Sequence, residues 1–143
     1  MNVEKLKAEL TRDEGLRLKP YLDSVGKLTV GVGRNLTDVG ISQSEALVLL
    51  ESDIMRTGSD LDKAIPWWKD LDEVRQRAVL NWTFNVGIGG LSTFTNAIKY
   101  LNVGMYDAAA KEMLNSLWSH QVGPRADRLA EMIRTGQEPK ETP

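Results

Sequence analysis

Two carboxylates and a hydroxyl stand close together near the start of the chain, at Glu14, Asp23 and Thr29. Two carboxyl groups in different surroundings can cleave a glycosidic bond, because one donates a proton to the leaving oxygen and the other, ionised, activates water or stabilises positive charge. Glu14 suits the acid role, since the end of a helix favours a neutral carboxyl. Asp23, in a solvated turn, suits the ionised role, and Thr29 can hold a water beside it.

The spacing of these residues alone leaves a structural interpretation open. Carboxylates are common at turns and helix ends, where they cap backbone groups or face solvent. The neighbouring Gly31-Val32-Gly33 resembles a fragment of a phosphate-binding loop, but the lysine and the helix that should follow are absent. A tight strand with a close approach of the backbone is the better interpretation of these glycines.

A helix and a hairpin are expected to position these residues. The helix is predicted over residues 3–13, with Asn2 as its N-cap and Gly15 near its C-cap. After it, turn chemistry at residues 23–26 and alternating apolar residues predict a hairpin. Thr29 is expected to point away from the apolar face, which is formed by Leu28, Val30 and Val32.

The rest of the chain reads as helical. Ser42 and Glu45 form a capping box that starts a long helix reaching to Pro66, and Gly58 and Ser59 are where it can bend or be interrupted. Further helices are predicted at 71–86, 92–102, 106–118 and 124–134, with a glycine-rich turn at 87–90.

The predicted fold class is therefore α+β, in a single domain over residues 1–143. A small lobe with the β-hairpin spans about 14–58, including the start of the connecting helix. A larger helical lobe spans about 59–136 and also takes in the N-terminal helix, residues 1–13.

Composition excludes several classes of function. A net charge of -2 with interleaved charges disfavours nucleic-acid binding, and the absence of cysteine with a single histidine gives no reason to expect a metal or another cofactor. The N-terminus has charges throughout and no apolar run, so neither membrane insertion nor a secretory signal is expected.

Tryptophans and a histidine could also contact a ligand. Trp67, Trp68, Trp82 and Trp118 can stack on sugar rings, yet tryptophans at helical spacing are more often core residues. Trp82 is predicted to be in the core, whereas the sequence leaves Trp118 open. His120 is expected in a loop between helices and receives no role.

The run from Asp13 to Gly33, D-E-G-L-R-L-K-x-Y-x-D-x-x-G-x-x-T-x-G-x-G, resembles the signature of the phage-type lysozymes of glycoside hydrolase family 24. A second block from Asn81 to Ile98, and the run S-L-W-S-H-Q-V-G-P-R-A-D-R-L that follows later, are similar to the helical lobe of that family. The resemblance extends to about Gly136 and implies a lysozyme-like fold.

The resemblance implies hydrolysis of the β-1,4 bond between N-acetylmuramic acid and N-acetylglucosamine in peptidoglycan, with inversion. Glu14 would be the general acid, and Asp23 and Thr29 would position the attacking water. Inversion predicts carboxyl groups separated by roughly 6.5 to 9.5 Å, which leaves room for that water. The family also pairs its glutamate with an arginine, here Arg125, and lines its saccharide cleft at the positions of Phe84, Asn85, Gln121 and Arg128.

The family also implies a biological setting. The expected role is that of a phage endolysin, a monomer that stays in the host cytoplasm until a holin pore releases it to the periplasm and cell wall. A lytic transglycosylase and a virion-associated wall-binding protein are the alternatives, and Asp23 and Thr29 argue against the first of them.

One departure from the family concerns a charged pair. Arg34 stands where many members have histidine, and the position of that histidine's acidic partner corresponds to Asp53. The sequence therefore predicts an ion pair between Arg34 and Asp53, which would not titrate through the arginine near neutral pH.

Overall fold

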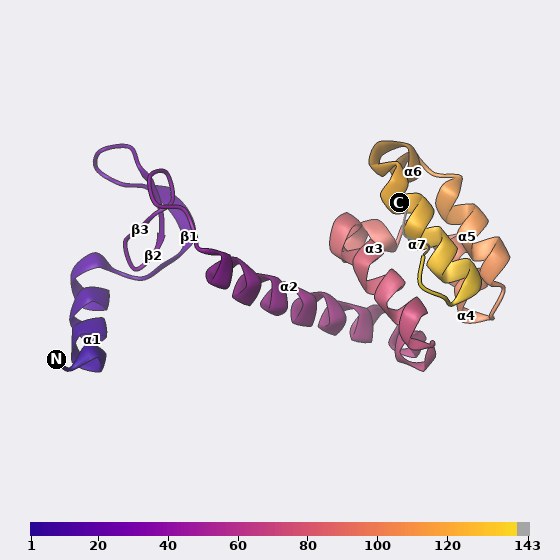
Figure 1. Cartoon of the computed structure of the whole chain (residues 1–143), viewed down its shortest axis with the longest axis horizontal. Coiled ribbons are helices and arrows are strands. Elements are labelled where there is room, and N and C mark those ends of the chain that lie inside the picture. The colour runs from indigo at the N-terminus through magenta and orange to yellow at the C-terminus, as the bar shows by residue number, and fades with distance from the viewer. Residues whose placement is uncertain (140–143) are drawn as a thin grey trace. The chain divides into compact units, whose positions relative to one another are not determined.

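The computed structural model describes residues 1–139 and divides into two compact units, Met1–Leu49 and a second that begins at Leu50. The first unit holds a helix, a small sheet and the start of a long helix (Figure 1): α1 (Val3–Glu14), β1 (Arg17–Leu22), β2 (Leu28–Gly31), β3 (Arg34–Asn35) and α2 (Gln43–Ala64). The second unit continues with η1 (Pro66–Asp70), α3 (Glu73–Leu91), α4 (Thr95–Asn102), α5 (Tyr106–Leu114), α6 (Leu117–Val122) and α7 (Pro124–Thr135). The predicted α+β class is confirmed.

Helix α1 begins and ends as its sequence predicts. The side chain of Asn2 accepts a hydrogen bond from the backbone N–H of Lys5 at 3.0 Å, which satisfies one of the free donors of the first turn. Gly15 ends the helix with φ +79°, and its N–H donates to the carbonyl of Thr11 at 2.9 Å. Glu14 is thus the last helical residue, next to the chain's turn into β1.

The three strands form one antiparallel sheet in the order β1-β2-β3. Thr29 lies directly opposite Tyr21 on one side and Asn35 on the other, so these three side chains share one face. Leu28 and Val30 alternate with Thr29 and occupy the other face. The predicted core face needs correction, because Thr29 is the buried residue at 4% exposed, Leu28 is 40% exposed, and Val32 lies after the end of β2. Strand β3 was not predicted, because two residues are too few to produce an alternating pattern.

The capping box of α2 is confirmed. The N–H of Glu45 donates to the Oγ of Ser42 at 3.1 Å, and the N–H of Ser42 donates to the Oε1 of Glu45 at 2.9 Å. Gly58 and Ser59 lie inside α2, which they do not interrupt.

Two helix predictions for the second unit need correction. The glycine-rich turn at 87–90 is a kink within α3, where Gly87 has φ 76° and ψ 162°. The helix predicted at 106–118 is divided into α5 and α6, because the Oγ of Ser116 accepts the N–H of Ser119 and starts a new helix. His120 therefore lies in α6, not in a loop.

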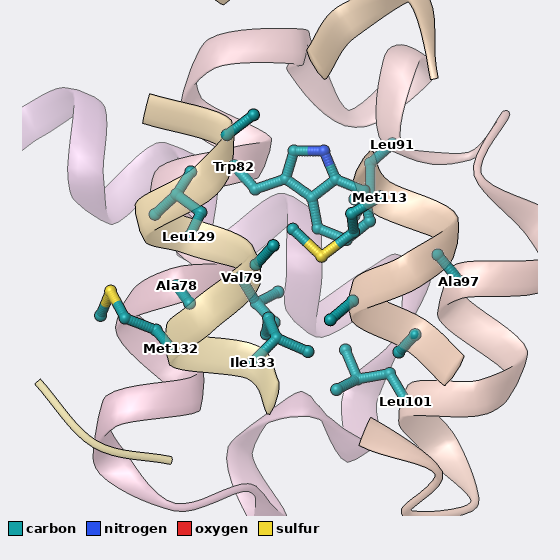
Figure 2. Packing of buried hydrophobic residues seen from close by; sticks show 14 of the residues in the cluster. Ala78, Val79, Trp82, Leu91, Ala97, Leu101, Met113, Leu129, Met132 and Ile133 are labelled. Carbon is teal, nitrogen blue, oxygen red and sulfur yellow. The ribbon is translucent and has the colours of Figure 1, made fainter. Parts of the chain in front are cut away.

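The core of the second unit gathers around Trp82, which is 1% exposed (Figure 2). Its ring packs edge-on against Phe94 at 4.9 Å between centroids and lies 6.0 Å from Trp118. The prediction for Trp82 is confirmed, and Trp118, which the sequence left open, is buried as well. Trp68 is also buried and donates its Nε1–H to Asp62 at 2.9 Å, whereas Trp67 is partly buried against the cluster.

Candidate active site

Glu14 ends α1 with its carboxylate against the backbone of Gly33. A methyl group in place of a hydrogen on Gly33 would lie 3.1 Å from Oε2 and 3.3 Å from Cδ of Glu14, closer than ordinary contact allows. Gly33 also has φ +69°, a conformation that other residues rarely adopt. Gly33 lies in the turn between β2 and β3, so the predicted tight strand is wrong at this residue. The predicted close approach of the backbone is confirmed there, and the group approached is the carboxylate of Glu14.

Asp23 uses one carboxylate oxygen to hold the turn between β1 and β2. Its Oδ1 accepts the backbone N–H groups of Val25 at 3.0 Å and Lys27 at 2.8 Å. The main chain of the turn closes with Gly26 donating to the carbonyl of Asp23 at 3.0 Å. The second oxygen, Oδ2, has no hydrogen-bond partner in the part of the chain that the structure describes, so it is free to bind water or substrate.

Thr29 is the one buried residue within 1–49, a range that the structure describes completely; its exposed fraction is 4%. Its Oγ1 donates a hydrogen bond to the carbonyl of Lys27 at 3.0 Å. Because this bond commits the hydroxyl proton, the oxygen of Thr29 is left as an acceptor. An acceptor suits a residue that has to orient a water.

The peptide groups of Lys27 bring Asp23 and Thr29 together. Asp23 accepts the N–H of Lys27, and Thr29 donates to its carbonyl, so both side chains are fixed to the same residue. A carboxylate with one free oxygen and a hydroxyl that can accept a hydrogen bond are therefore both attached to one residue of the hairpin. Such a pair can bind a water and accept its proton.

The predicted pair between Arg34 and Asp53 is wrong. Arg34 instead binds Glu45 with both arms of the guanidinium, at 2.8 Å to Oε1 and 2.7 Å to Oε2. Asp53 pairs with Arg56 one turn further along α2, at 2.5 Å. The capping box holds Glu45 beside the start of α2, where it reaches Arg34 on β3, whereas Asp53 has a cation within its own helix.

The Arg34 pair changes the acidity of Glu45. The hydrogen bonds from the Arg34 guanidinium, followed by those from Ser42, lower the pKa of Glu45 to about 2. Both charged side chains remain partly open to solvent, at 37% for Arg34 and 42% for Glu45. Glu45 is consequently ionised at every pH at which an enzyme of this kind would work.

The saccharide-binding residues predicted in the second unit line two recesses. Phe84, Arg125 and Arg128 line a groove of about 710 Å³. Asn85 and Gln121 line another of about 630 Å³, beside Trp118. The structure thus gathers the five residues into two groups, and the adjacent Phe84 and Asn85 belong to different ones.

Two of these residues have hydrogen bonds that the sequence did not predict. The guanidinium of Arg125 donates to the side-chain oxygen of Asn81 at 2.8 Å through Nη2 and 3.1 Å through Nε. The Oδ1 of Asn85 accepts the indole N–H of Trp118 at 2.7 Å. Both hydrogen bonds restrain the side chains of Arg125 and Asn85 within the second unit.

Sequence analysis missed the contributions of Lys27 and Glu45. Lys27 acts through its backbone N–H and carbonyl, and the residue type at a position does not indicate what its backbone groups bind. Glu45 was recognised as a capping residue. The signal for its second role was Arg34, an arginine eleven positions earlier, for which the sequence predicted a different partner, Asp53.

The described residues contain neither a metal-binding cluster nor a membrane-spanning helix. Among residues 1–139 there is no cluster of three or more histidine, cysteine, aspartate or glutamate side chains placed to hold a metal ion. None of the helices in that range is long and apolar enough to cross a membrane.

Comparisons with known proteins agree on one family. The model of the family described as phage lysozyme matches residues 11–134. An endolysin of Acyrthosiphon pisum secondary endosymbiont phage 1 is 33% identical, over 92% of this chain and 89% of the relative. "Probable T4-type lysozyme 1" of Dictyostelium discoideum is 28% identical, over 94% and 96%. The pre-baseplate central spike protein of Enterobacteria phage T4 is 31% identical over 89% of this chain, and the match covers 27% of that protein.

Proposed function

Because the chain belongs to the phage lysozyme family and is therefore a glycosidase that lyses peptidoglycan, we propose that it hydrolyses the β-1,4 bond between N-acetylmuramic acid and N-acetylglucosamine with inversion. The observation that carries the proposal is the joint attachment of Asp23 and Thr29 to Lys27. It ties a carboxylate with a free oxygen and a hydroxyl acceptor to the same residue, and these are the groups that binding a nucleophilic water requires.

In this mechanism Glu14 donates its proton to the glycosidic oxygen as the bond to the anomeric carbon breaks. Water, held by Oδ2 of Asp23 and Oγ1 of Thr29, attacks that carbon from the opposite face and gives a proton to Asp23. The products are a reducing sugar with inverted configuration and a free hydroxyl on the other fragment. Glu14 ends ionised and Asp23 protonated, and exchange with solvent restores both.

The same proposal assigns the recesses of the helical unit to the glycan. Phe84 offers an exposed aromatic face for a sugar ring, and Arg125 and Arg128 supply hydrogen-bond donors in the same groove. Asn85 and Gln121 supply amides in the neighbouring recess. Arg125 is also the proposed partner of Glu14, a role taken from the family resemblance.

We extend the proposal to the organisation of the chain. Residues 1–143 form one lysozyme domain, in which the hairpin lobe spans about 14–58 and the helical lobe about 59–136. The N-terminal helix, residues 1–13, is assigned to the helical lobe. Val3, Leu6 and Leu10 form an apolar stripe along it.

The proposed setting is lysis of a bacterial host by a phage. The enzyme acts as a monomer, without a cofactor, and a holin pore releases it from the host cytoplasm to the cell wall. The match to a pre-baseplate central spike protein favours a second setting, in which the same activity belongs to the virion. Detecting the chain in purified particles of the phage that encodes it would support that second setting.

A lytic transglycosylase is the chemical alternative. It would release 1,6-anhydro sugars without consuming water, whereas the proposed hydrolase leaves reducing ends that are heavier by one water. Mass spectrometry of digested peptidoglycan distinguishes the two products, and NMR of the first-formed anomer tests inversion.

The decisive experiment measures clearing of outer-membrane-permeabilised Gram-negative cells by the parent, Glu14→Gln and Asp23→Asn. We expect rapid clearing by the parent and at least a hundredfold loss in each variant, of the order that a missing acid or base costs. A folded parent without activity, or either variant with full activity, would refute the assignment.

A further inference from the structure

The ion pair between Arg34 and Glu45 lies one residue from the contact that confines the proposed acid. Gly33 precedes Arg34 directly, and its backbone lies against the carboxylate of Glu14. The location of Gly33 therefore decides how far the Glu14 carboxylate can extend. Whatever fixes the turn that carries Gly33 also fixes the space in which Glu14 donates its proton.

This turn has little support from its own strands. It joins β2 to β3, and both Gly31 and Gly33 have φ +69°. Strand β3 comprises two residues, whose paired positions are Thr29 with Asn35 and Val30 with Arg34. One further backbone hydrogen bond, from the N–H of Leu36 to the carbonyl of Leu28 at 2.7 Å, lies at the end of the ladder away from the turn. A ladder of this length leaves the turn dependent on side-chain contacts as well.

Arg34 supplies such contacts from the start of α2. Its Nη1 donates to the carbonyl of Gly40 at 3.2 Å and to Oε1 of Glu45 at 2.8 Å, and its Nη2 lies 2.7 Å from Oε2. Glu45 is itself held by the N–H of Ser42. A planar guanidinium bound at both arms has one geometry, so it restrains β3 more tightly than a single contact would.

The pair lies on the face of the sheet opposite Thr29. Arg34 is paired with Val30, and Val30 alternates with Thr29 along β2. The guanidinium is therefore directed away from the face that carries Thr29, and it acts on the reaction through Gly33 and not by touching the glycan.

We propose that the Arg34–Glu45 pair is a positioning device for the general acid, which holds the Gly33 turn against the carboxylate of Glu14. This inference rests on the proposed function, since it assigns a task to the residue taken as the acid. It gives the capping glutamate of α2 a role in catalysis in addition to its role in starting the helix.

The test compares Arg34→Gln and Glu45→Gln with the parent on soluble, uncross-linked peptidoglycan strands, at a temperature where circular dichroism finds all three folded. We expect kcat to fall by about 10- to 100-fold for Arg34→Gln, the range that small misplacements of a reacting group produce. Glu45→Gln keeps the capping box and should lose less, and KM should change by less than about twofold in both. Arg34→Lys, which retains the charge but not the fork, should recover part of kcat.

Two controls separate positioning from stability. Ser42→Ala removes the cap hydroxyl but leaves the Arg34–Glu45 pair, so it should lower the melting temperature and leave kcat unchanged. Arg56→Gln breaks another ion pair of α2, the one with Asp53, and should change neither kcat nor KM. Parental kcat in both folded Arg34→Gln and Glu45→Gln, or an equal loss in Ser42→Ala, would overturn the inference.

The same experiment includes Glu14→Gln, so that failure of the positioning role and failure of the proposed function give different results. If Glu14→Gln is inactive while Arg34→Gln and Glu45→Gln are fully active, the proposed function stands and only the positioning role is refuted. An active Glu14→Gln would remove the proposed function, and the role of the pair with it.

Discussion

The Cα of Gly33 lies so close to the carboxylate of Glu14 that a methyl group there would approach Oε2 to 3.1 Å. The contact joins the end of α1 to the turn between β2 and β3. Position 33 therefore requires glycine for two reasons. The carboxylate of Glu14 leaves too little room for a Cβ, and the backbone has a positive φ.

Gly33→Ala should therefore lose more activity than its effect on stability explains. The new methyl group forces the Glu14 carboxylate to move, and Gly31→Ala is the matched control, because Gly31 has the same φ of +69° but no atom within 4 Å of the added carbon. Both variants should lose about 1–2 kcal/mol of stability from backbone strain. Only Gly33→Ala should lose an additional tenfold or so in kcat, measured on folded protein. Equal kcat in the two variants would show that the contact is without consequence.

Substitutions at Asp23 should separate its structural and chemical contributions. Asp23→Asn keeps a side-chain oxygen for the N–H groups of Val25 and Lys27, so thermal unfolding should stay close to that of the parent. Asp23→Ala leaves those donors without their partner and should cost about 1–2 kcal/mol. Both should be inactive in peptidoglycan hydrolysis, because neither has the carboxylate. If Asp23→Ala has the same melting temperature as Asp23→Asn, the stability of the turn does not depend on this oxygen.

The acid dependence of stability should carry a contribution from Glu45. Its pKa is about 2 in the folded protein against an ordinary value near 4.3, so the unfolded chain binds the proton more readily. The resulting stabilisation is fully present above about pH 5 and is lost as the pH falls towards 2. We expect the difference in melting temperature between the parent and Glu45→Gln to shrink across this window, and a difference that is constant from pH 6 to 2 would contradict the assignment.

Arg34→His provides a second pH window with the opposite sign. A histidine paired with Glu45 would have a raised pKa, so its stabilisation would be present below about pH 6.5 and lost as the pH rises through the folded value. Arginine does not titrate in this range. The melting curves of Arg34→His and the parent should therefore diverge above neutral pH, and parallel curves would count against the pairing.

A substitution in α1 tests the proposal that this helix stabilises the helical lobe. All four tryptophans lie beyond Leu50, so tryptophan fluorescence follows unfolding of the second unit. Leu6→Asp interrupts the apolar stripe and should lower the melting temperature measured by fluorescence by several degrees, as a loss of about 1–3 kcal/mol would. Glu9→Gln, an exposed change in the same helix, should leave it unaltered. If the two variants have equal melting temperatures by tryptophan fluorescence, the assignment of residues 1–13 to the helical lobe is wrong.

Local signals made much of the fold predictable. Asn2 and Gly15 mark the ends of α1 by chemistry that acts within one turn, and Ser42 with Glu45 marks the start of α2 in the same way. The break between α5 and α6 was missed because the apolar pattern continues through it, and Ser116 alone gives the competing cap signal.

The candidate site was predictable in residue type but less so in arrangement. Glu14, Asp23 and Thr29 were found by spacing and by a family motif, which identify side chains. The attachment of Asp23 and Thr29 to Lys27 depends on the geometry of the turn, and the partner of Arg34 depends on which carboxylate the fold brings near. Such tertiary contacts cannot be predicted from the residue pattern of one sequence.

The hydrogen bond from Trp118 to Asn85 determines whether the Asn85 side chain offers hydrogen-bond donors or an acceptor to a ligand. Its oxygen is engaged by the indole N–H, and its two amide N–H groups have no partner among residues 1–139. Asn85 therefore presents itself as a donor, matched to an acetamido carbonyl or a carboxylate and poorly matched to a hydroxyl hydrogen or an amide N–H. In the proposed function, a buried tryptophan thus determines that this surface asparagine offers donors to the sugar.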